Sequence, residues 1–233
     1  MTNRRKFIKE TSLLGAITML GSSVKSFAIA KPNLEDELII GHSNHKYKVA
    51  KDWAKIGVND TPIFNCHEMV QDHKGCLIML GDNVHNNVLV FDKAGKLLDN
   101  WGNMFPGGHG LSIGGEGSDQ FLMLTDCGYY QDKTGKWGKQ AGQVVKTTLD
   151  GRLHFALGHP KTIGVYTNDM LFMPTETAVA PNGDIYVADG YGSDFIIQYD
   201  ANGKYIRHFG GRNNANPDHN LKEAHGVCVD TRP

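Results

Sequence analysis

The 233-residue sequence has little net charge and, in its main part, no long apolar run. Lys and Arg (24) nearly balance Asp and Glu (25), which leaves a formal net charge of -1 and a pI of about 6.8. A near-neutral chain lacks the basic surface that a polyanion attracts, so we expect no nucleic-acid partner. Beyond residue 30 no run of 18 apolar residues occurs. We therefore predict no membrane span in the mature chain.

Cysteines are few and show no C-x-x-C spacing. An oxidising compartment would permit a disulfide. We interpret the four thiols instead as small buried side chains. They are Cys66, Cys76, Cys127 and Cys228.

Residues 1–30 differ in character from the rest of the chain. A basic start containing Arg4 and Arg5 precedes a mildly apolar stretch, and Ala28-Ile29-Ala30 has the form of a cleavage site. Paired arginines before a weak apolar run are typical of a twin-arginine signal peptide. We therefore expect export of the folded protein to a periplasmic or extracytoplasmic location. The alternative is an amphipathic N-terminal helix.

Glycine, by contrast, is abundant (28 residues) and recurs between short apolar runs. The stretch 174–211 is the most regular: four apolar runs alternate with turns such as Pro181-Asn182-Gly183-Asp184 and Ala201-Asn202-Gly203-Lys204. Asn-Gly between apolar runs indicates a tight hairpin whose two central residues both need φ > 0. The stretch therefore predicts a four-stranded antiparallel meander.

Similar units open at residues 67, 109, 176 and 225. Four strands repeated at roughly 40–50 residues are the signature of a β-propeller. The one longer interval is accounted for by loops at 129–142 and 159–173. The fold class is therefore all-β, a propeller of four-stranded blades.

Three segments follow from this pattern. Residues 1–30 form the signal. Residues 31–64 form an N-terminal segment that supplies either an outer strand closing the ring or a cover for an edge. Residues 65–233 form an incomplete propeller of three blades plus the first strand of a fourth. We expect the sequence to be a C-terminally truncated part, because a propeller closes with typically four to eight blades.

Histidine stands at the opening of three units: His67, His109 and His225. First strands line the central channel of a propeller, so equivalent positions would converge around its axis. Three imidazoles with an open fourth position are the form of a catalytic zinc site. In the remaining unit we place Glu176 at this position, as a carboxylate that supports the ligands. Calcium would instead require carboxylate and amide oxygens, and a polar channel mouth that merely tolerates histidine is the plainer alternative.

Tyr191 follows the second strand of its unit, in a turn near the same face. A phenol there could act as a general base if a metal lowered its pKa, or could simply pack as a turn aromatic. Asp82, Asp126 and Asp189 occupy repeated places after second strands, and we predict that they cap turn amides. The six other histidines of the propeller, at positions 73, 85, 154, 159, 208 and 219, are interpreted as surface residues.

The stretches 106–113, 174–211 and 224–226 resemble NHL-type propellers, and within that group the peptidyl-α-hydroxyglycine α-amidating lyases. The resemblance implies six blades, zinc held by three histidines on alternate blades and a catalytic tyrosine. On this chain it implies His109 and His225 as ligands, with the third in the missing part, and Tyr191 as the catalytic residue. The family also uses an arginine after the second strand of its first blade. Here that place, residues 79–83, contains none.

Two functions of different classes follow. The first is an exported zinc-dependent lyase that acts on a peptide or small-molecule substrate at the channel. The second is a non-catalytic propeller that binds a protein, peptide or glycan, because propellers are widely used as scaffolds.

Overall fold

The computed structural model describes residues 38–57 and 59–232, which fall into two compact units. The predicted signal at residues 1–30 lies outside the described residues. The first unit contains an antiparallel hairpin of β1 (Ile39–His42) and β2 (His45–Lys48). The second unit begins at Asp52 and holds all other described strands.

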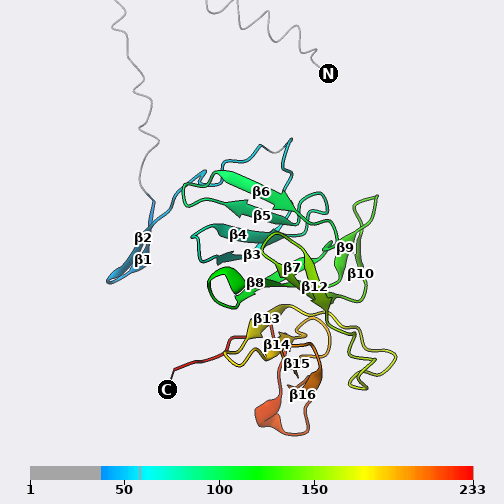
Figure 1. Ribbon diagram of the computed structural model, residues 1–233. Coiled ribbons are helices and arrows are strands. Elements are labelled where there is room, and N and C mark those ends of the chain that lie inside the picture. The colour runs from blue at the N-terminus through cyan, green and yellow to red at the C-terminus, as the bar shows by residue number, and fades with distance from the viewer. Residues whose placement is uncertain (1–37, 58, 233) are drawn as a thin grey trace, which may run out of the picture. The chain divides into compact units, whose positions relative to one another are not determined.

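The second unit contains three four-stranded antiparallel sheets, and we call them blades 1, 2 and 3 (Figure 1). Blade 1 contains β3 (Cys66–Gln71), β4 (Leu77–Gly81), β5 (Val88–Phe91) and β6 (Leu97–Trp101). Blade 2 contains β7 (Gly108–Gly114), β8 (Phe121–Asp126), β11 (Gln143–Thr148) and β12 (Leu153–Ala156). Blade 3 contains β13 (Glu176–Val179), β14 (Ile185–Ala188), β15 (Phe195–Tyr199) and β16 (Tyr205–Gly210). The described residues are thus all-β, with several four-stranded antiparallel sheets of the kind that form propeller blades, which confirms the predicted fold class.

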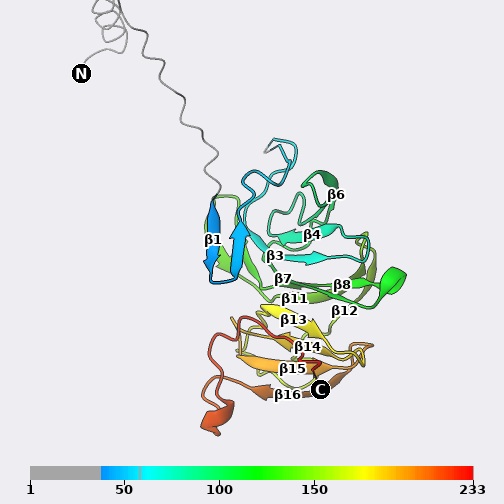
Figure 2. The same cartoon turned by 90° about the vertical axis from the view of Figure 1, so that its left-hand side faces the viewer.

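First strands of neighbouring blades lie side by side, as propeller geometry requires. Figure 2 shows β3, β7 and β13 in succession, with β7 between the other two. Side chains that project from the start of these three strands therefore lie on one surface.

Apolar side chains on both faces of a strand explain why the blades pack face to face. On β8, Leu122 and Leu124 are buried with Ile78 and Leu80 of blade 1. The intervening Met123 points the other way and joins a buried cluster that includes Ile185 and Val187 of blade 3. Each fully buried leucine contributes about 1.5–3 kcal/mol to stability. A middle blade that is apolar on both faces needs a neighbour on each side.

In the outer turns of blades 1 and 3, an aspartate carboxylate caps backbone N–H groups. The Asp92 carboxylate accepts hydrogen bonds from the backbone N–H groups of Ala94 and Lys96, both at 2.9 Å. Asp200 does the same for Asn202 and Lys204, also at 2.9 Å. Glycine three residues after each aspartate has a positive φ, +83° and +81°.

The turn type therefore differs from the sequence prediction. Neither Asn182 nor Asn202 has a positive φ; only Gly183 (+88°) and Gly203 do. A ladder shift lies between Gln198 and Tyr199, at the end of β15 that leads into the turn. The carboxylate cap favours a longer turn ending in a left-handed glycine over the two-residue turn that we expected.

Residues 129–142 are not a plain loop, contrary to our expectation. They contain a second hairpin, β9 (Tyr129–Gln131) and β10 (Trp137–Lys139), inserted between β8 and β11. Asp132 caps its turn as Asp92 and Asp200 cap theirs, with bonds to the N–H groups of Thr134 and Lys136. Two short 3-10 turns complete the description: η1 (Gly117–Asp119) and η2 (Pro217–His219).

The segment after Asp52 covers an edge of blade 1. The Trp53 ring lies 5.3 Å from that of Phe91, centroid to centroid, and its indole N–H donates to the Lys93 carbonyl. Lys55 forms a single parallel bridge with Lys96. An isolated bridge is not a strand, and whether the segment 31–64 closes the ring or covers an edge stays a prediction.

Residues 224–230 form no strand, although we predicted the first strand of a further blade there. A strand is held by ladder hydrogen bonds, and the described residues supply no neighbouring strand for this segment. The burial of the cysteines also differs in part from our interpretation. Cys127 is buried, but Cys66 and Cys228 are exposed, because they lie at a blade opening and in this unpaired segment. None of the helical turns in the described ranges is long and apolar enough to cross a membrane.

Candidate functional site

Two of the candidate histidines stand at β-bulges. In blade 1, Cys66 pairs with Gly81 and Glu68 with Leu80, so His67 is an extra residue in the ladder. In blade 2, Gly108 pairs with Asp126 and Gly110 with Thr125, which makes His109 the extra residue there. Bulges re-aim side chains and occur often beside active sites. The bulges direct these two imidazoles to the same place.

Blade 3 has no such bulge, and this corrects our placement of Glu176. Glu176 pairs directly with Ala188 and therefore matches Glu68 and Gly110, not the histidines. The residue that precedes it, Thr175, takes the place of the histidine. Without the extra residue, the strand has no position from which a side chain is turned into the site.

Glu176 instead faces Glu68 across the first strands. Burial raises the pKa of Glu176; the Thr177 N–H, which donates to its carboxylate at 2.8 Å, opposes this, and the hydrogen bond and negative charge of Glu68 raise it further. The Glu176 carboxyl therefore holds its proton more tightly than a free glutamate does.

His109 is held in one tautomer by the neighbouring blade. Its Nδ1 lies 2.9 Å from the carbonyl oxygen of Thr175, so Nδ1–H donates and Nε2 keeps its lone pair. Burial lowers the pKa of His109 to about 4, and charges on His67 and His225 act in the same direction. The ring is therefore neutral near pH 7 and offers Nε2 as a base or a ligand.

Two polar atoms from distant parts of the chain meet at this nitrogen, which is Nε2 of His109. The Nε2 atoms of His109 and His225 are 3.1 Å apart. The hydroxyl of Tyr191 lies 3.3 Å from Nε2 of His109 and 3.2 Å from Nε2 of His225. The His67 ring stacks on the His109 ring at 4.7 Å between centroids. The structure thus brings together His67, His109, His225 and Tyr191.

His225 reaches the site because hydrogen bonds hold the unpaired segment 224–230 against blade 3. The Thr175 hydroxyl donates to the Ala224 carbonyl at 2.8 Å, and the Ala224 N–H donates to the Asp194 carboxylate at 3.2 Å. Gly190 allows this approach, because a Cβ at that position would overlap the Ala224 carbonyl.

The repeated aspartates do the structural work that we predicted. Asp82 accepts the N–H of Asn65 at 2.8 Å, Asp126 that of Gly107 at 3.1 Å, and Asp189 that of Met173 at 2.6 Å. Each donor lies just before the first strand of its blade. The carboxylates therefore fix the strand openings from which the site is built.

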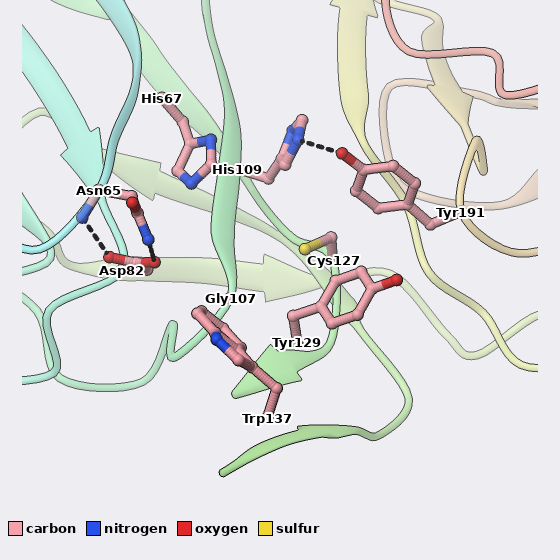
Figure 3. A pocket seen from close by; sticks show the side chains of 9 residues that line it. All are labelled: Asn65, His67, Asp82, Gly107, His109, Cys127, Tyr129, Trp137 and Tyr191. Atoms are coloured by element: carbon pink, nitrogen blue, oxygen red, sulfur yellow. Dashed lines mark hydrogen bonds between the residues drawn. The ribbon is translucent and has the colours of Figure 1, made fainter. Parts of the chain in front are cut away.

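Figure 3 shows the cavity in front of these residues, about 290 Å³ in volume. Tyr129, Tyr191 and Trp137 supply aromatic surface, and the Tyr129 ring meets the Tyr191 ring edge to face at 5.6 Å. Burial raises the pKa of Tyr191, so its phenol holds its proton at neutral pH in the absence of a cation. The complete lining is Asn65, His67, Asp82, Gly107, His109, Cys127, Tyr129, Trp137 and Tyr191.

The inserted hairpin was the part of the site that sequence reasoning missed. Its signal was present, since Asp132 to Lys136 repeats the Asp-x-x-Gly-Lys pattern of the outer turns. Of the histidines interpreted as surface residues, His159 is half-buried and packs edge to face on Tyr166 and Phe172. The other five are exposed, as predicted.

The donor set fits part of a zinc site. Two nitrogens bound to one tetrahedral zinc at 2.0–2.1 Å lie about 3.3 Å apart, close to the 3.1 Å between Nε2 of His109 and Nε2 of His225. Within the described ranges, no group of three or more His, Cys, Asp or Glu side chains could hold a metal ion. The pair therefore fits two of the ligands of such a site.

The chain is distantly similar to NHL-repeat proteins and to amidating lyases. It is 27% identical over 172 residues to a probable peptidyl-alpha-hydroxyglycine alpha-amidating lyase of Caenorhabditis elegans, covering 71% of this chain and 40% of that protein. It is 33% identical over 113 residues to NHL repeat-containing protein 3 of Mus musculus, covering 48% and 30%. It is 32% identical over 127 residues to peptidyl-alpha-hydroxyglycine alpha-amidating lyase 1 of Drosophila melanogaster, covering 54% and 21%. The chain thus spans less than half the length of these relatives, and no protein-family model matches it.

Proposed function

We propose that the chain is part of an exported, zinc-dependent carbon–nitrogen lyase that acts on peptidyl-α-hydroxyglycine at this cavity. One observation carries the proposal: the Nε2 atoms of His109 and His225 and the hydroxyl of Tyr191 lie within 3.1–3.3 Å of one another. The distant similarity to amidating lyases supports the same reaction.

His109 and His225 would hold the metal through Nε2, and His67 ranks below them. The His67 ring meets the face of His109 in a stack, whereas ligands point their nitrogens at a common centre. When bound, zinc would polarise the substrate hydroxyl and lower its pKa.

Tyr191 would move the proton. Its hydroxyl accepts the proton of the substrate hydroxyl while it gives its own proton to the nitrogen that leaves. The electron pair of the O–H bond forms the C=O bond of glyoxylate, and the pair of the C–N bond stays on the amide nitrogen. The products are a peptide amide and glyoxylate. A phenol that keeps its proton at neutral pH is suited to such a relay.

Metal analysis and glyoxylate release test the proposal together. The longest available form of the protein, refolded with zinc, should bind the metal stoichiometrically and release glyoxylate from a peptidyl-α-hydroxyglycine. His109→Ala and His225→Ala should each abolish tight zinc binding, because each removes one ligand. His85→Ala, an exposed histidine outside the site, is the matched control and should change neither quantity. Wild-type protein without transition metal and without glyoxylate release would refute the lyase.

A non-catalytic scaffold that binds a peptide, protein or glycan is the second candidate. The observation that favours it is the stretch 79–83, which contains no arginine where the resembled lyases have one. In that case the histidines line the channel, and peptide binding is unchanged by chelation or by Tyr191→Phe.

A further inference from the structure

The inserted β9–β10 hairpin has one face turned toward the candidate site. In its register, Trp137 pairs with Gln131 and Lys139 with Tyr129. Side chains alternate along strands, so these four lie on one face, which we call the inner face, and Tyr130 lies on the other. All four inner-face residues line cavities around the site. A register shift of one residue in the hairpin would turn all four side chains away from the cavities.

Lys139 brings a positive charge close to Tyr191. Its Nζ lies 5.0 Å from the centre of the Tyr129 ring, and that ring packs against Tyr191. Lys139 and Tyr191 line one cavity of about 310 Å³, with Asp169 also on its wall. Among the ion pairs of the described residues, none includes Lys139. An α-hydroxyglycine carries a carboxylate on its reacting carbon, which is the group that such a cation would bind.

Trp137 separates the main cavity from a second one, which has an apolar wall and a polar part made by Asp82, Asn83 and Gln131. A second cavity of about 300 Å³ shares Asp82 and Trp137 with the first. Phe64 stacks on Trp137 at 6.0 Å between ring centroids with 28° between planes, and both rings are about half exposed, at 52% and 49%. Ile63, Val84 and Pro106 complete the apolar wall. The apolar wall of this cavity, next to the main cavity, is the kind of surface that takes up a large apolar side chain.

We propose that the inner face of the β9–β10 hairpin is the substrate-recognition surface. Lys139 binds the carboxylate of the reacting residue, and Trp137 with Phe64 binds the apolar side chain of the residue that precedes it. The inference rests on the proposed function and narrows its substrates to peptides with a free C-terminal carboxylate and a large apolar penultimate residue.

Binding of unreactive ligands tests the surface without relying on catalysis. The probes are N-acetyl-Phe-Gly, its C-terminal amide, which lacks the carboxylate, and N-acetyl-Ala-Gly, which lacks the large side chain. Calorimetry on the zinc-treated wild-type chain should give about tenfold tighter binding of the first probe than of either other. Lys139→Gln should abolish the preference for N-acetyl-Phe-Gly over its amide and keep its preference over N-acetyl-Ala-Gly. Trp137→Ala should do the reverse. Lys136→Gln, in the turn of the same hairpin, is the matched control and should leave both preferences intact.

Glyoxylate release, measured on the same preparations, separates the two ideas. Wild-type release of glyoxylate with preferences that neither variant alters would overturn the hairpin assignment and leave the lyase standing. Both preferences with no glyoxylate release would support the recognition surface and overturn the lyase. Failure of wild-type protein to bind N-acetyl-Phe-Gly more tightly than its analogues would overturn the inference.

Discussion

His109 shows how much chemistry the position of one residue can determine. Its Nδ1 is occupied by a carbonyl of the next blade, its ring is stacked by His67, and its Nε2 is left for Tyr191 and His225. None of these contacts is local in sequence. His109 is thus neutral because it is buried, and it is oriented and available because of four neighbours that the fold supplies.

Tyr191→Phe should abolish activity without disturbing the site. The change removes the hydroxyl that contacts both imidazoles but keeps the ring that packs on His109 and Tyr129. Proton transfer by a positioned group contributes about 10²–10⁴-fold to rate, so we expect a loss of about a hundredfold or more in kcat. Zinc content should be unchanged. Tyr130→Phe, on the outer face of the hairpin, serves as control, and equal activity of the two variants would contradict the relay.

Asp126 should make stability depend on pH. Burial raises its pKa to about 6, against 3.8 for the free group, although the N–H groups of Gly128 and Gly107 oppose the shift. The folded state therefore binds the proton more tightly, and this contribution is complete below pH 3.8 and lost as pH rises through 6. The difference is on the order of 3 kcal/mol.

Urea unfolding of wild type and Asp126→Asn at pH 4, 5, 6 and 7 isolates this group. Because asparagine does not titrate, the wild-type free energy of unfolding should fall relative to that of the variant as pH rises from 4 to 7. A difference that stays constant across this range would show that Asp126 has an ordinary pKa.

At the level of elements, the contact between blades 2 and 3 depends on the absence of a side chain. A Cβ at Gly110 would overlap the backbone of Thr175 and Glu176. Gly110→Ala should therefore push β13 away from β7, break the His109–Thr175 hydrogen bond and cost about 1–3 kcal/mol. Thermal unfolding measures the loss.

Gly226→Ala is a matched control, because Gly226 follows His225 as Gly110 follows His109. A Cβ there meets no atom within 4 Å, and the backbone needs no positive φ. The melting temperature of this variant should equal that of wild type. Equal losses in both variants would mean that the blade contact is not the cause.

The blades could be predicted from sequence because their signals are local. The short apolar run of β8 and the capped Asp-x-x-Gly-Lys turns each span only a few residues. The bulges at His67 and His109 could not, because a bulge exists only relative to the partner strand. For the same reason the sequence placed Glu176 at the position of the histidines, which Thr175 occupies in the structure. The convergence of Tyr191 and His225 was expected only through the repeat, and their actual distances depend on how the segment at Ala224 is tied down.

For the whole molecule, the proposed export rests on the first thirty residues. Replacing Arg4 and Arg5 together by lysine should leave the precursor in the cytoplasm, because the transport machinery reads the arginine pair. Cell fractionation and immunoblotting of the two forms measure this. Lys6→Arg, which keeps the pair, should be exported normally. Normal export of the double variant would refute the twin-arginine assignment.

The bulge at His109 is one residue that the sheet itself does not need. Blade 3 shows that the sheet is complete without an extra residue in its first strand. Deleting His109 would therefore turn the opening of blade 2 into an ordinary ladder. Replacing His109 by another residue would instead keep the bulge and remove only the imidazole. In blade 2 the candidate ligand is the extra residue of the bulge, so a one-residue deletion removes the ligand and the bulge together.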